Sequence, residues 1–479
     1  MKKKQLVKVE PVRLKPFLGM QPGKWLTILY AIVIVLIVFL VGFLPGILNG
    51  RMRVDFTSAA GNAAVYVDGQ YKGGTPFTTW IESGEHEVEF RVYGQTIDSF
   101  VTYIRHPVFL TWLWPRRVTC DSTAAIPPAL YQTAYTRFLS EVEAVSAVTS
   151  YDQGSPYEPV YTSYAQRGIP TPNEVVELAF AFISCSEMLE DAIQAARILA
   201  PDYDFSIPKA LFSEPSEELS AQFASAQIAV QSTVKLGPQQ TISYGNLSLS
   251  GHQVLPGTFS TGTGQTSMTY AGTVSALVSD TLDQAFYIAD SEITEYQFAL
   301  FLEENPVWAL SNLDYLVGQG LTDSYYLSGI STSTAFPSNR PVRNISFEAA
   351  LAFCAWLSEK TDRTVFIPTE TQWSAALSAL DNPTWQSGLL LTTKSGSIDS
   401  MLGGVWEFTS SVFVPMLRAQ RLFRPDQAEV TRAALAAYPV EGDVIIKGGS
   451  YLTGADGGEI GFASRSECVE IAGFRVAWL

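Results

Sequence analysis

Cysteine and histidine are the side chains in this sequence best suited to hold a transition metal or act as nucleophiles, and both are scarce. The cysteines are Cys120, Cys185, Cys354 and Cys468, and the histidines are His86, His106 and His252. No two cysteines stand in a CxxC spacing, and no histidine lies near a second histidine or a cysteine in the sequence. A zinc or iron site of the usual kind is therefore not expected. An oxidising compartment would permit disulfides, but the sequence does not choose between the pairings.

The elements that must position these residues begin with a long apolar segment. No Asp, Glu, Lys, Arg or His occurs between Lys24 and Arg51, and this run exceeds the ~20 residues that cross a bilayer core. A cleaved signal peptide would have a shorter apolar region, of about 7–15 residues, and a small-residue cleavage site after it. No such site is evident here. We therefore predict an uncleaved transmembrane helix over residues 25–48, preceded by a basic cytoplasmic tail over residues 1–24.

Charge predicts the orientation of this helix and limits the partners of the chain. Seven basic side chains precede the apolar run, whereas only Arg51 and Arg53 follow it closely. Because Lys and Arg favour the cytoplasmic side, the N-terminus is predicted inside and residues 51–479 outside, in the periplasm or extracellular space. The net charge of the chain is −16, and most of the acids lie in this outer part. Such a body would repel nucleic acid, so basic proteins, peptides or metal cations are the expected partners.

Two blocks follow the span. Residues 52–105 contain short runs of β-branched and aromatic residues near period two, which predicts strands, with turn residues between them. Residues 120–235 have a helical pattern, with helices predicted near 128–147 and 215–235. Between these two, a long buried helix is predicted after a cap at Thr171 and a first-turn proline. Cys185 lies on this buried stretch and is interpreted as an inert core thiol.

Residues 65–94 resemble the PEGA domain, a small β-sandwich-like module that is common on bacterial surface proteins. The resemblance depends on an apolar strand followed by Asp-Gly, Gly-x-Pro and Gly-x-His. These positions are Asp68, Gly69, Gly74, Pro76, Gly84 and His86. We interpret His86 as a residue that packs or caps a turn. The resemblance implies a protein of the bacterial envelope, anchored in the cytoplasmic (inner) membrane by its single span.

Residues 241–479 form the third block, which mixes few helices with many short strands and long loops. Three helix starts have good capping residues, at Thr294, Ser346 and Thr369. Glycine-rich turns follow, and one of them carries Trp406. Long loops on a small rigid scaffold are frequent carriers of binding function.

The motifs of this block, in their order, resemble the formylglycine-generating-enzyme (sulfatase-modifying factor) domain family. That family has a loop-rich α/β fold related to the C-type lectin fold, so the whole chain is predicted to be a multidomain α+β protein. The matching segments are PGTF (256–259), FYIADSEITEYQFALFL (286–302), PVRNISFEAALAFCAWL (341–357), IPTETQWSAAL (367–377), GGVWEFTSS (403–411), KGGSY (447–451) and GFRV (473–476). Each segment is weak evidence alone, but seven in order are specific.

The resemblance implies a copper site that this chain does not repeat. Enzymes of the family bind copper through two cysteines just after the RGGSY element, and the matching positions here are Thr453 and Gly458. Neither can replace a thiolate, which soft Cu(I) requires. A second branch, of iron-dependent sulfoxide synthases, needs several histidines, but this block has only His252. We expect no cofactor: copper is not predicted, and calcium stays open because the family's calcium loops are not recognisable.

Other departures concern the turns and cysteines of the family. The Asn of the family's GNVWEW turn is Gly404 here, and the Arg of its RGGS element is Lys447. Cys354 matches a family cysteine that often forms a disulfide to the last strand, where this chain has Val476. Cys354 is therefore interpreted as a packed thiol, with Cys468 left as an alternative partner.

The framework of the family is retained. Its cleft or framework positions are Trp373, Trp406, Glu407, Arg465 and Arg475. The tryptophans are expected to supply buried area, and the two arginines to pair with internal carboxylates, Glu407 and Glu370 being the candidates.

Two functions compete on this basis. The first is a membrane-anchored, extracytoplasmic binding or scaffold protein with a catalytically degenerate domain, a pseudoenzyme of the envelope that meets other envelope proteins or peptides. The alternative is a family oxidase or hydroxylase that acts on an extracytoplasmic peptide through unusual ligands such as Cys354 and Cys468. A purely structural role in an envelope complex differs from the first only in its partner.

Overall fold

The computed structural model describes residues 15–111, 113–151, 157–212, 230–262, 277–388, 398–453 and 460–479. The chain divides into two compact units. The first comprises Met1–Thr133 with Gln166–Ile169, and the second comprises Ala134–Ala165 with Pro170–Leu479. Most of the predicted cytoplasmic tail, much of the helix predicted near 215–235 and the position Gly458 lie outside the described residues.

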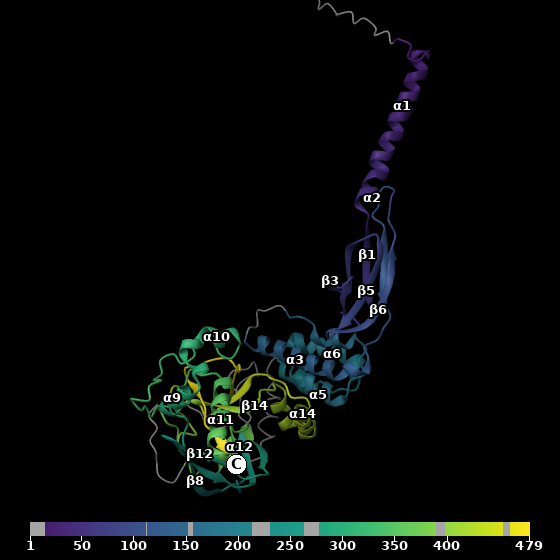
Figure 1. Cartoon of the computed structure of the whole chain (residues 1–479). Coiled ribbons are helices and arrows are strands. Elements are labelled where there is room, and N and C mark those ends of the chain that lie inside the picture. The colour runs from purple at the N-terminus through teal and green to yellow at the C-terminus, as the bar shows by residue number, and fades with distance from the viewer. Residues whose placement is uncertain are drawn as a thin grey trace, which may run out of the picture. The chain divides into compact units, whose positions relative to one another are not determined.

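The first unit begins with an apolar helical segment. It is made of α1 (Pro22–Val38), the π-helix η1 (Phe39–Phe43) and α2 (Leu44–Asn49). The segment Pro22–Asn49 has a mean hydropathy of 3.1 and almost none of it is buried, so its length and composition suit a membrane. It is a signal sequence or a single membrane anchor (Figure 1).

Two antiparallel-rich sheets follow this helix. Their strands are β1 (Arg51–Ser58), β2 (Ala64–Val67), β3 (Gln70–Gly74), β4 (Phe77–Glu82), β5 (Gly84–Val92), β6 (Gln95–Ile104) and β7 (Arg117–Ser122). One sheet has the order β4-β1-β7 and the other β3-β2-β5-β6. The two sheets pack through aromatic rings: the ring centroids of Phe56 on β1 and Phe90 on β5 lie 6.4 Å apart. The predicted Asp68-Gly69 turn is confirmed, since both residues have positive φ, as tight hairpin turns require.

The second unit contains the helical middle region. Its helices are α3 (Tyr131–Tyr151, whose first residues belong to the first unit), α4 (Val160–Ala165), α5 (Asn173–Ala181), α6 (Ser186–Leu199) and α7 (Ser206–Phe212). The long helix predicted from Thr171 is wrong in two respects. It is interrupted between α5 and α6, and the residue at the N-cap of α5 is Pro172, without a side-chain cap. Cys185 is the N-cap of α6, and its sulfur accepts the Met188 N–H at 3.5 Å. The residue is half-buried and not a fully buried core thiol.

The C-terminal part of this unit is built on two sheets and a hairpin. The larger sheet has the order β13-β18-β12-β9-β8, the smaller β16-β15-β14-β17, and β10 pairs with β11. The strands are β8 (Leu236–Tyr244), β9 (Leu247–Val254), β10 (Gly257–Gly262), β11 (Leu277–Leu282), β12 (Phe286–Ala289), β13 (Val365–Phe366), β14 (Trp406–Val412), β15 (Val444–Lys447), β16 (Ile460–Ala463), β17 (Ala472–Gly473) and β18 (Ala477–Trp478).

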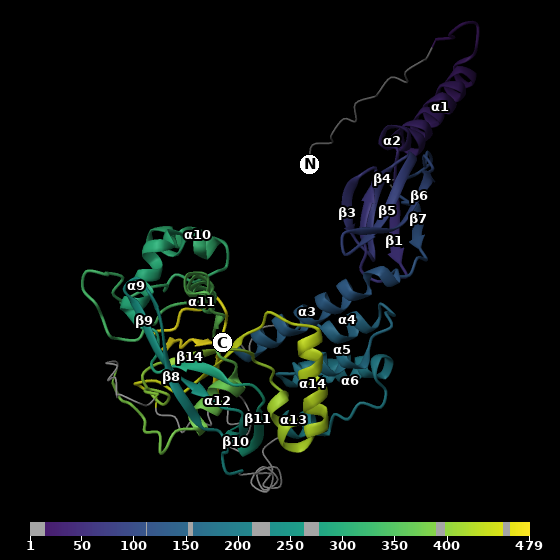
Figure 2. The ribbon, with the colours of Figure 1, turned by 60° about the horizontal axis from the view of Figure 1, so that its bottom comes forward.

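Helices cover these sheets. They are α9 (Glu295–Glu304), α10 (Leu313–Gly318), α11 (Phe347–Thr361), α12 (Glu370–Ser378), α13 (Leu417–Phe423) and α14 (Pro425–Ala437). All three predicted caps are confirmed: Thr294 and Thr369 form capping boxes, and Ser346 accepts the Ala349 N–H. The helices α13 and α14 lie between β14 and β15 in sequence, and α14 packs on α5 of the middle region (Figure 2). The chain is thus a multidomain α+β protein with an apolar helix, a β-rich region, a helical middle and a loop-rich C-terminal domain.

Candidate functional site

The centre of the C-terminal domain is a buried ion pair between two predicted framework residues. Glu407 lies on β14, and Arg475 follows β17, which pairs with β14 in parallel. The Arg475 Nη2 is 2.7 Å from Glu407 Oε1, and its Nε is 3.0 Å from Oε2. The remaining guanidinium N–H groups donate to the carbonyls of Ala289 and Asp399, each at 2.8 Å. Both side chains are almost completely buried. Of the two carboxylates named as candidate partners for Arg465 and Arg475, Arg475 thus pairs with Glu407.

Trp373 completes this centre from α12. Its indole Nε1–H donates to Glu407 Oε2 at 2.8 Å, and the ring is fully buried. The Lys447 ammonium lies 5.6 Å from the centroid of the same ring, within cation–π range. Gly448 has φ +96°, and a Cβ there would lie 3.1 Å from the Trp373 ring. The glycine therefore serves both a left-handed backbone and a close approach of the ring.

A second buried carboxylate, Glu292, was not found from the sequence. It lies just after β12 with no exposed surface, and its Oε1 accepts the Val405 N–H at 3.3 Å. A Cβ on Gly404 would lie 2.3 Å from this Oε1, and Gly404 has φ +64°. The glycine that replaces the family's Asn at this turn therefore leaves the space that Glu292 fills. The signal that could have found Glu292 is its place in FYIADSEIT, directly before the Thr294 cap.

Burial and the neighbouring Glu407 charge raise the pKa of Glu292 to about 8, from an ordinary value of 4.5. Between these two pH values Glu292 therefore keeps its proton in the folded state and loses it in the unfolded chain. Linkage then makes the folded state less stable as pH rises from about 4.5 to about 8.

We predict that Glu292→Gln removes this pH dependence, because the amide keeps the shape of the neutral acid and does not titrate. The measurement is the midpoint of urea unfolding of the C-terminal domain at pH 5 to pH 8, in wild type and variant. The stability of the variant relative to wild type should increase with pH. A constant difference across this range would mean that Glu292 does not titrate as described.

Thr453 and Gly458 are the positions at which the sequence resemblance implies copper-binding cysteines. Thr453 is exposed, and its Oγ1 accepts the Trp406 Nε1–H at 3.2 Å and lies 2.9 Å from Ser450 Oγ. The Trp385 Nε1–H donates to the Ser450 carbonyl at 3.0 Å, so two tryptophans hold this turn. Gly458 lies outside the described residues. The described side chains around Thr453 therefore form a hydrogen-bond network of hydroxyl and indole groups.

Arg465 pairs with a carboxylate that differs from the expected candidates. Its Nε donates to Glu348 Oε1 at 2.6 Å, and its guanidinium lies 4.8 Å from the centroid of the Phe347 ring. Glu348 is in the first turn of α11, so the ion pair ties the last strands of the domain to the start of this helix. Both side chains are a quarter exposed, and the contact is therefore weaker than the buried pair at Arg475.

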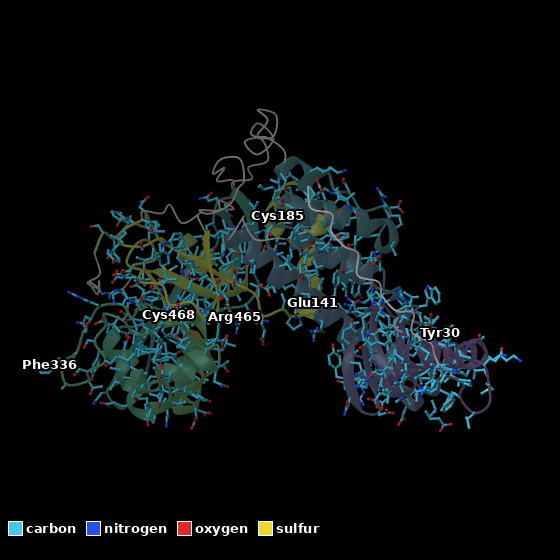
Figure 3. All side chains as sticks on the ribbon, turned by 90° about the horizontal axis from the view of Figure 1, so that it is seen from above. Tyr30, Glu141, Cys185, Phe336, Arg465 and Cys468 are labelled. Atoms are coloured by element: carbon cyan, nitrogen blue, oxygen red, sulfur yellow. The ribbon has the colours of Figure 1, made fainter. Side chains whose placement is uncertain are left out.

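All four cysteines are free thiols. Burial raises the pKa of Cys354, and it raises the pKa of Cys468 to about 12. The Cys468 sulfur lies 2.9 Å from Thr322 Oγ1, within hydrogen-bond distance, in the buried part of the domain. Cys185 lies among the middle helices, away from Cys468 (Figure 3). Thiols with raised pKa are poor nucleophiles and poor metal ligands at neutral pH.

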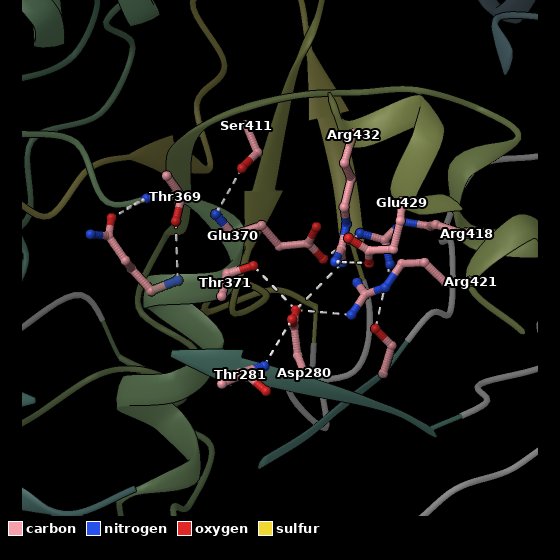
Figure 4. Close-up of polar contacts among 12 residues, drawn as sticks. Asp280, Thr281, Thr369, Glu370, Thr371, Ser411, Arg418, Arg421, Glu429 and Arg432 are labelled. Atoms are coloured by element: carbon pink, nitrogen blue, oxygen red, sulfur yellow. Dashed lines mark hydrogen bonds and ion pairs between the residues drawn. The ribbon is translucent and has the colours of Figure 1, made fainter. Parts of the chain in front are cut away.

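A cluster of alternating charges binds the α13–α14 segment to the domain (Figure 4). Arg421 Nη2 is 2.9 Å from Asp280 Oδ2 on β11, and Arg418 pairs with Glu370 at the start of α12. Burial alone would raise the pKa of Glu370, but the charges of Arg418, Lys447 and Arg421 lower it to about 2. The predicted partner Glu370 is thus used, but by Arg418. This cluster is structural, and sequence reasoning missed it because its members are far apart in the chain.

Within the described ranges, no group of three His, Cys, Asp or Glu side chains is arranged to hold a metal ion. The remaining histidines fit this picture. His86 bonds to Asp68 Oδ2 at 2.6 Å and to the Glu82 carbonyl at 2.9 Å, and His252 bonds to Asp290 at 2.6 Å. The predicted turn role of His86 is confirmed by these contacts, which join β5 to the Asp68 turn.

Comparison with known protein families gives matches to two regions of the chain. Residues 250–396 match the sulfatase-modifying factor enzyme 1-like domain, and residues 52–94 match the PEGA domain. The chain therefore carries a domain of each family, and both predicted resemblances are confirmed.

Individual relatives are distant. A protein of Borreliella burgdorferi described as an uncharacterized protein is 31% identical over 90 residues, which is 18% of each chain. The match thus spans less than a fifth of that relative. Among solved structures, PvdO from Pseudomonas aeruginosa is 16% identical, with a TM-score of 0.32 over 50% of this chain and 98% of that one.

Proposed function

We propose that this chain is a membrane-anchored, extracytoplasmic binding or scaffold protein whose C-terminal domain keeps a family fold without the family's copper chemistry. The observation that carries the proposal is Thr453. It stands where the resemblance places a copper-binding cysteine, and its hydroxyl is engaged by Trp406 and Ser450. In finer terms, the C-terminal domain is proposed to have the C-type-lectin-related fold and residues 52–105 to form a β-sandwich.

The retained anchor is supported by contacts at the end of the apolar segment. The Leu110 N–H donates to the Gly42 carbonyl at 2.7 Å, and the rings of Phe43 and Phe109 lie 4.9 Å apart. A signal peptide that is removed has no reason to pack on the folded domain that follows it. The basic residues before the segment support the proposed orientation, with the N-terminus in the cytoplasm and the acidic body in the periplasm or extracellular space.

Membrane extraction tests the anchor. Full-length chain expressed in a Gram-negative bacterium should stay in the membrane pellet after alkaline carbonate washing, and its intact mass should include residues 1–50. External protease should degrade the body in spheroplasts and leave the tail protected. Release of a shorter, soluble chain would contradict the anchor.

The competing enzyme hypothesis needs thiolate ligands outside the usual motif. Burial raises the pKa of both Cys354 and Cys468, which disfavours that role. The test is peptide oxidase activity of the purified full chain with Cu(I) and oxygen, compared with a chain that carries Cys354→Ser and Cys468→Ser. Activity that both serines abolish would establish the enzyme and overturn the scaffold proposal. A stoichiometric partner that co-purifies from solubilised membranes would favour the scaffold.

A further inference from the structure

The loop between β6 and β7, residues 105–116, carries several large apolar side chains that are exposed among its described residues. Its sequence is RHPVFLTWLWPR, and Trp112 lies outside the described residues. Three of them are strongly exposed: Phe109 is 45% exposed, Leu113 49% and Trp114 65%. Soluble domains seldom gather such side chains on one short loop without a partner.

This loop packs directly on the end of the apolar helical segment. Besides the Leu110 and Phe109 contacts, the His106 Nε2 lies 3.0 Å from the Gly46 carbonyl oxygen. A Cβ on Gly46 would lie 2.2 Å from the Val108 carbonyl oxygen, so the glycine allows the two backbones to approach closely. The loop is therefore held at one level along the helix.

That level coincides with the outer boundary of a bilayer. Lys24 is the last charge before the span, so Trp25 marks its inner boundary. At 1.5 Å per residue, Gly42 lies about 26 Å further along the helix. The hydrocarbon core is about 30 Å thick, which puts Gly42 and the loop that contacts it just inside the outer interface. Tryptophan is enriched at this depth, where Trp114 would lie.

Basic residues surround the apolar tip. Arg105, Arg116 and Arg117 are exposed and flank the loop, and no acid occurs between Asp98 and Asp121. Arg51, at the end of the span, is also exposed and pairs with Glu82 at 3.2 Å. In a chain with a net charge of −16, this local excess of arginine is unusual. Arginine matches lipid phosphate in charge and in hydrogen-bond geometry.

We propose that the β6–β7 loop is a second membrane contact, in which Phe109, Leu113 and Trp114 enter the outer leaflet and Arg105, Arg116 and Arg117 bind phospholipid phosphates. The proposal rests on the anchor proposed above and goes beyond it. The span alone would leave the PEGA domain free to swing. The loop, fixed to the span and inserted beside it, holds this domain at one orientation against the bilayer.

Depth-dependent quenching tests the loop. The full-length chain carries Cys185→Ser, because the other native cysteines are buried and serine is a good helix cap. An NBD fluorophore is attached to Leu113→Cys, to Leu40→Cys in the span, or to Tyr71→Cys on β3, an exposed control. The proteins are placed in phosphatidylethanolamine–phosphatidylglycerol vesicles with brominated acyl chains. Bromolipid should quench the probes at 113 and 40 similarly and leave the probe at 71 unchanged.

The outcomes separate the two proposals. An unquenched probe at Leu40→Cys would overturn the anchor itself. Quenching at 40 without quenching at 113, where aqueous iodide quenches instead, would overturn only the membrane contact. A probe at 113 that neither bromolipid nor iodide reaches would mean that protein covers the loop, which also overturns the proposal.

The arginines have a separate readout in the same vesicles. Replacing Arg105, Arg116 and Arg117 by glutamine should reduce bromolipid quenching at position 113 in phosphatidylglycerol vesicles. Quenching that the three substitutions leave unchanged would contradict the phosphate contacts.

Discussion

Arg475→Met is expected to destabilise the C-terminal domain by about 3–5 kcal/mol, because it removes the cation that is paired with the buried Glu407 carboxylate. Glu407 would lose its paired guanidinium, and the carbonyls of Ala289 and Asp399 would lose their donors. The measurement is amide hydrogen exchange of the full-length chain in detergent, read over peptides from β12, β14 and the C-terminus.

Arg465→Met is the matched control. It also removes an arginine from a carboxylate in the same domain, but the Arg465–Glu348 pair is a quarter exposed. Exposed pairs contribute less than about 1 kcal/mol. Protection should therefore fall strongly for the Arg475 variant and slightly for the Arg465 variant. Equal losses would contradict the central role of the buried pair.

Trp373→Ala is expected to cost about 3–5 kcal/mol, as large-to-small changes of buried aromatic residues do. The substitution leaves a cavity between α12 and β14, and it removes the N–H that donates to Glu407 at 2.8 Å. It also takes away the ring beside Lys447. The urea midpoint of the C-terminal domain, followed by near-UV circular dichroism, should fall.

Trp385→Ala is the control for size and hydrogen bonding. Trp385 also donates its indole N–H, to the Ser450 carbonyl, but 42% of the residue is exposed. A much smaller loss is expected because the side chain leaves no closed cavity. Trp373→Phe should fall between the two alanine variants, since it restores most of the volume without the donor. Losses of the same size for both tryptophans would mean that Trp373 is not a core element.

Features that depend on a few neighbouring residues could be predicted from the sequence. The caps at Thr294, Ser346 and Thr369 follow from hydroxyl side chains directly before apolar helices, and the structure has each of them. The Asp68-Gly69 turn is of the same kind. That Arg475 pairs with an internal carboxylate could be predicted because a buried charge needs a partner, but the sequence left Glu407 and Glu370 open as that partner.

Features that depend on contacts between distant segments could not be predicted. Glu292 is one of several acids in its neighbourhood, and only the fold shows that it alone lies against Gly404. Arg418 takes Glu370 because the α13–α14 segment folds back over α12, which no local pattern encodes. The break before Cys185 is not visible in the sequence because no Gly or Pro marks it, and the apolar end of α5 could equally continue as a buried helix or enter a buried turn.

The loop at residues 105–116 illustrates the same limit. Its composition suggests a partner, but the sequence places it about 60 residues after the helix on which it packs. Only the contacts with Gly42 and Gly46 show at which level of the apolar helical segment the loop lies. A membrane contact of this kind therefore becomes visible at the level of tertiary structure.

Copper titration tests whether the C-terminal domain lacks the copper site of the family. The purified full-length chain in detergent is titrated with Cu(I) against a competing chromogenic chelator, and the bound metal is examined by X-ray absorption. Because Thr453 offers a hydroxyl where a thiolate would be needed, we predict no stoichiometric, high-affinity Cu(I) site and no sulfur in the copper coordination shell. One tightly held Cu(I) per chain with two sulfur ligands would contradict it.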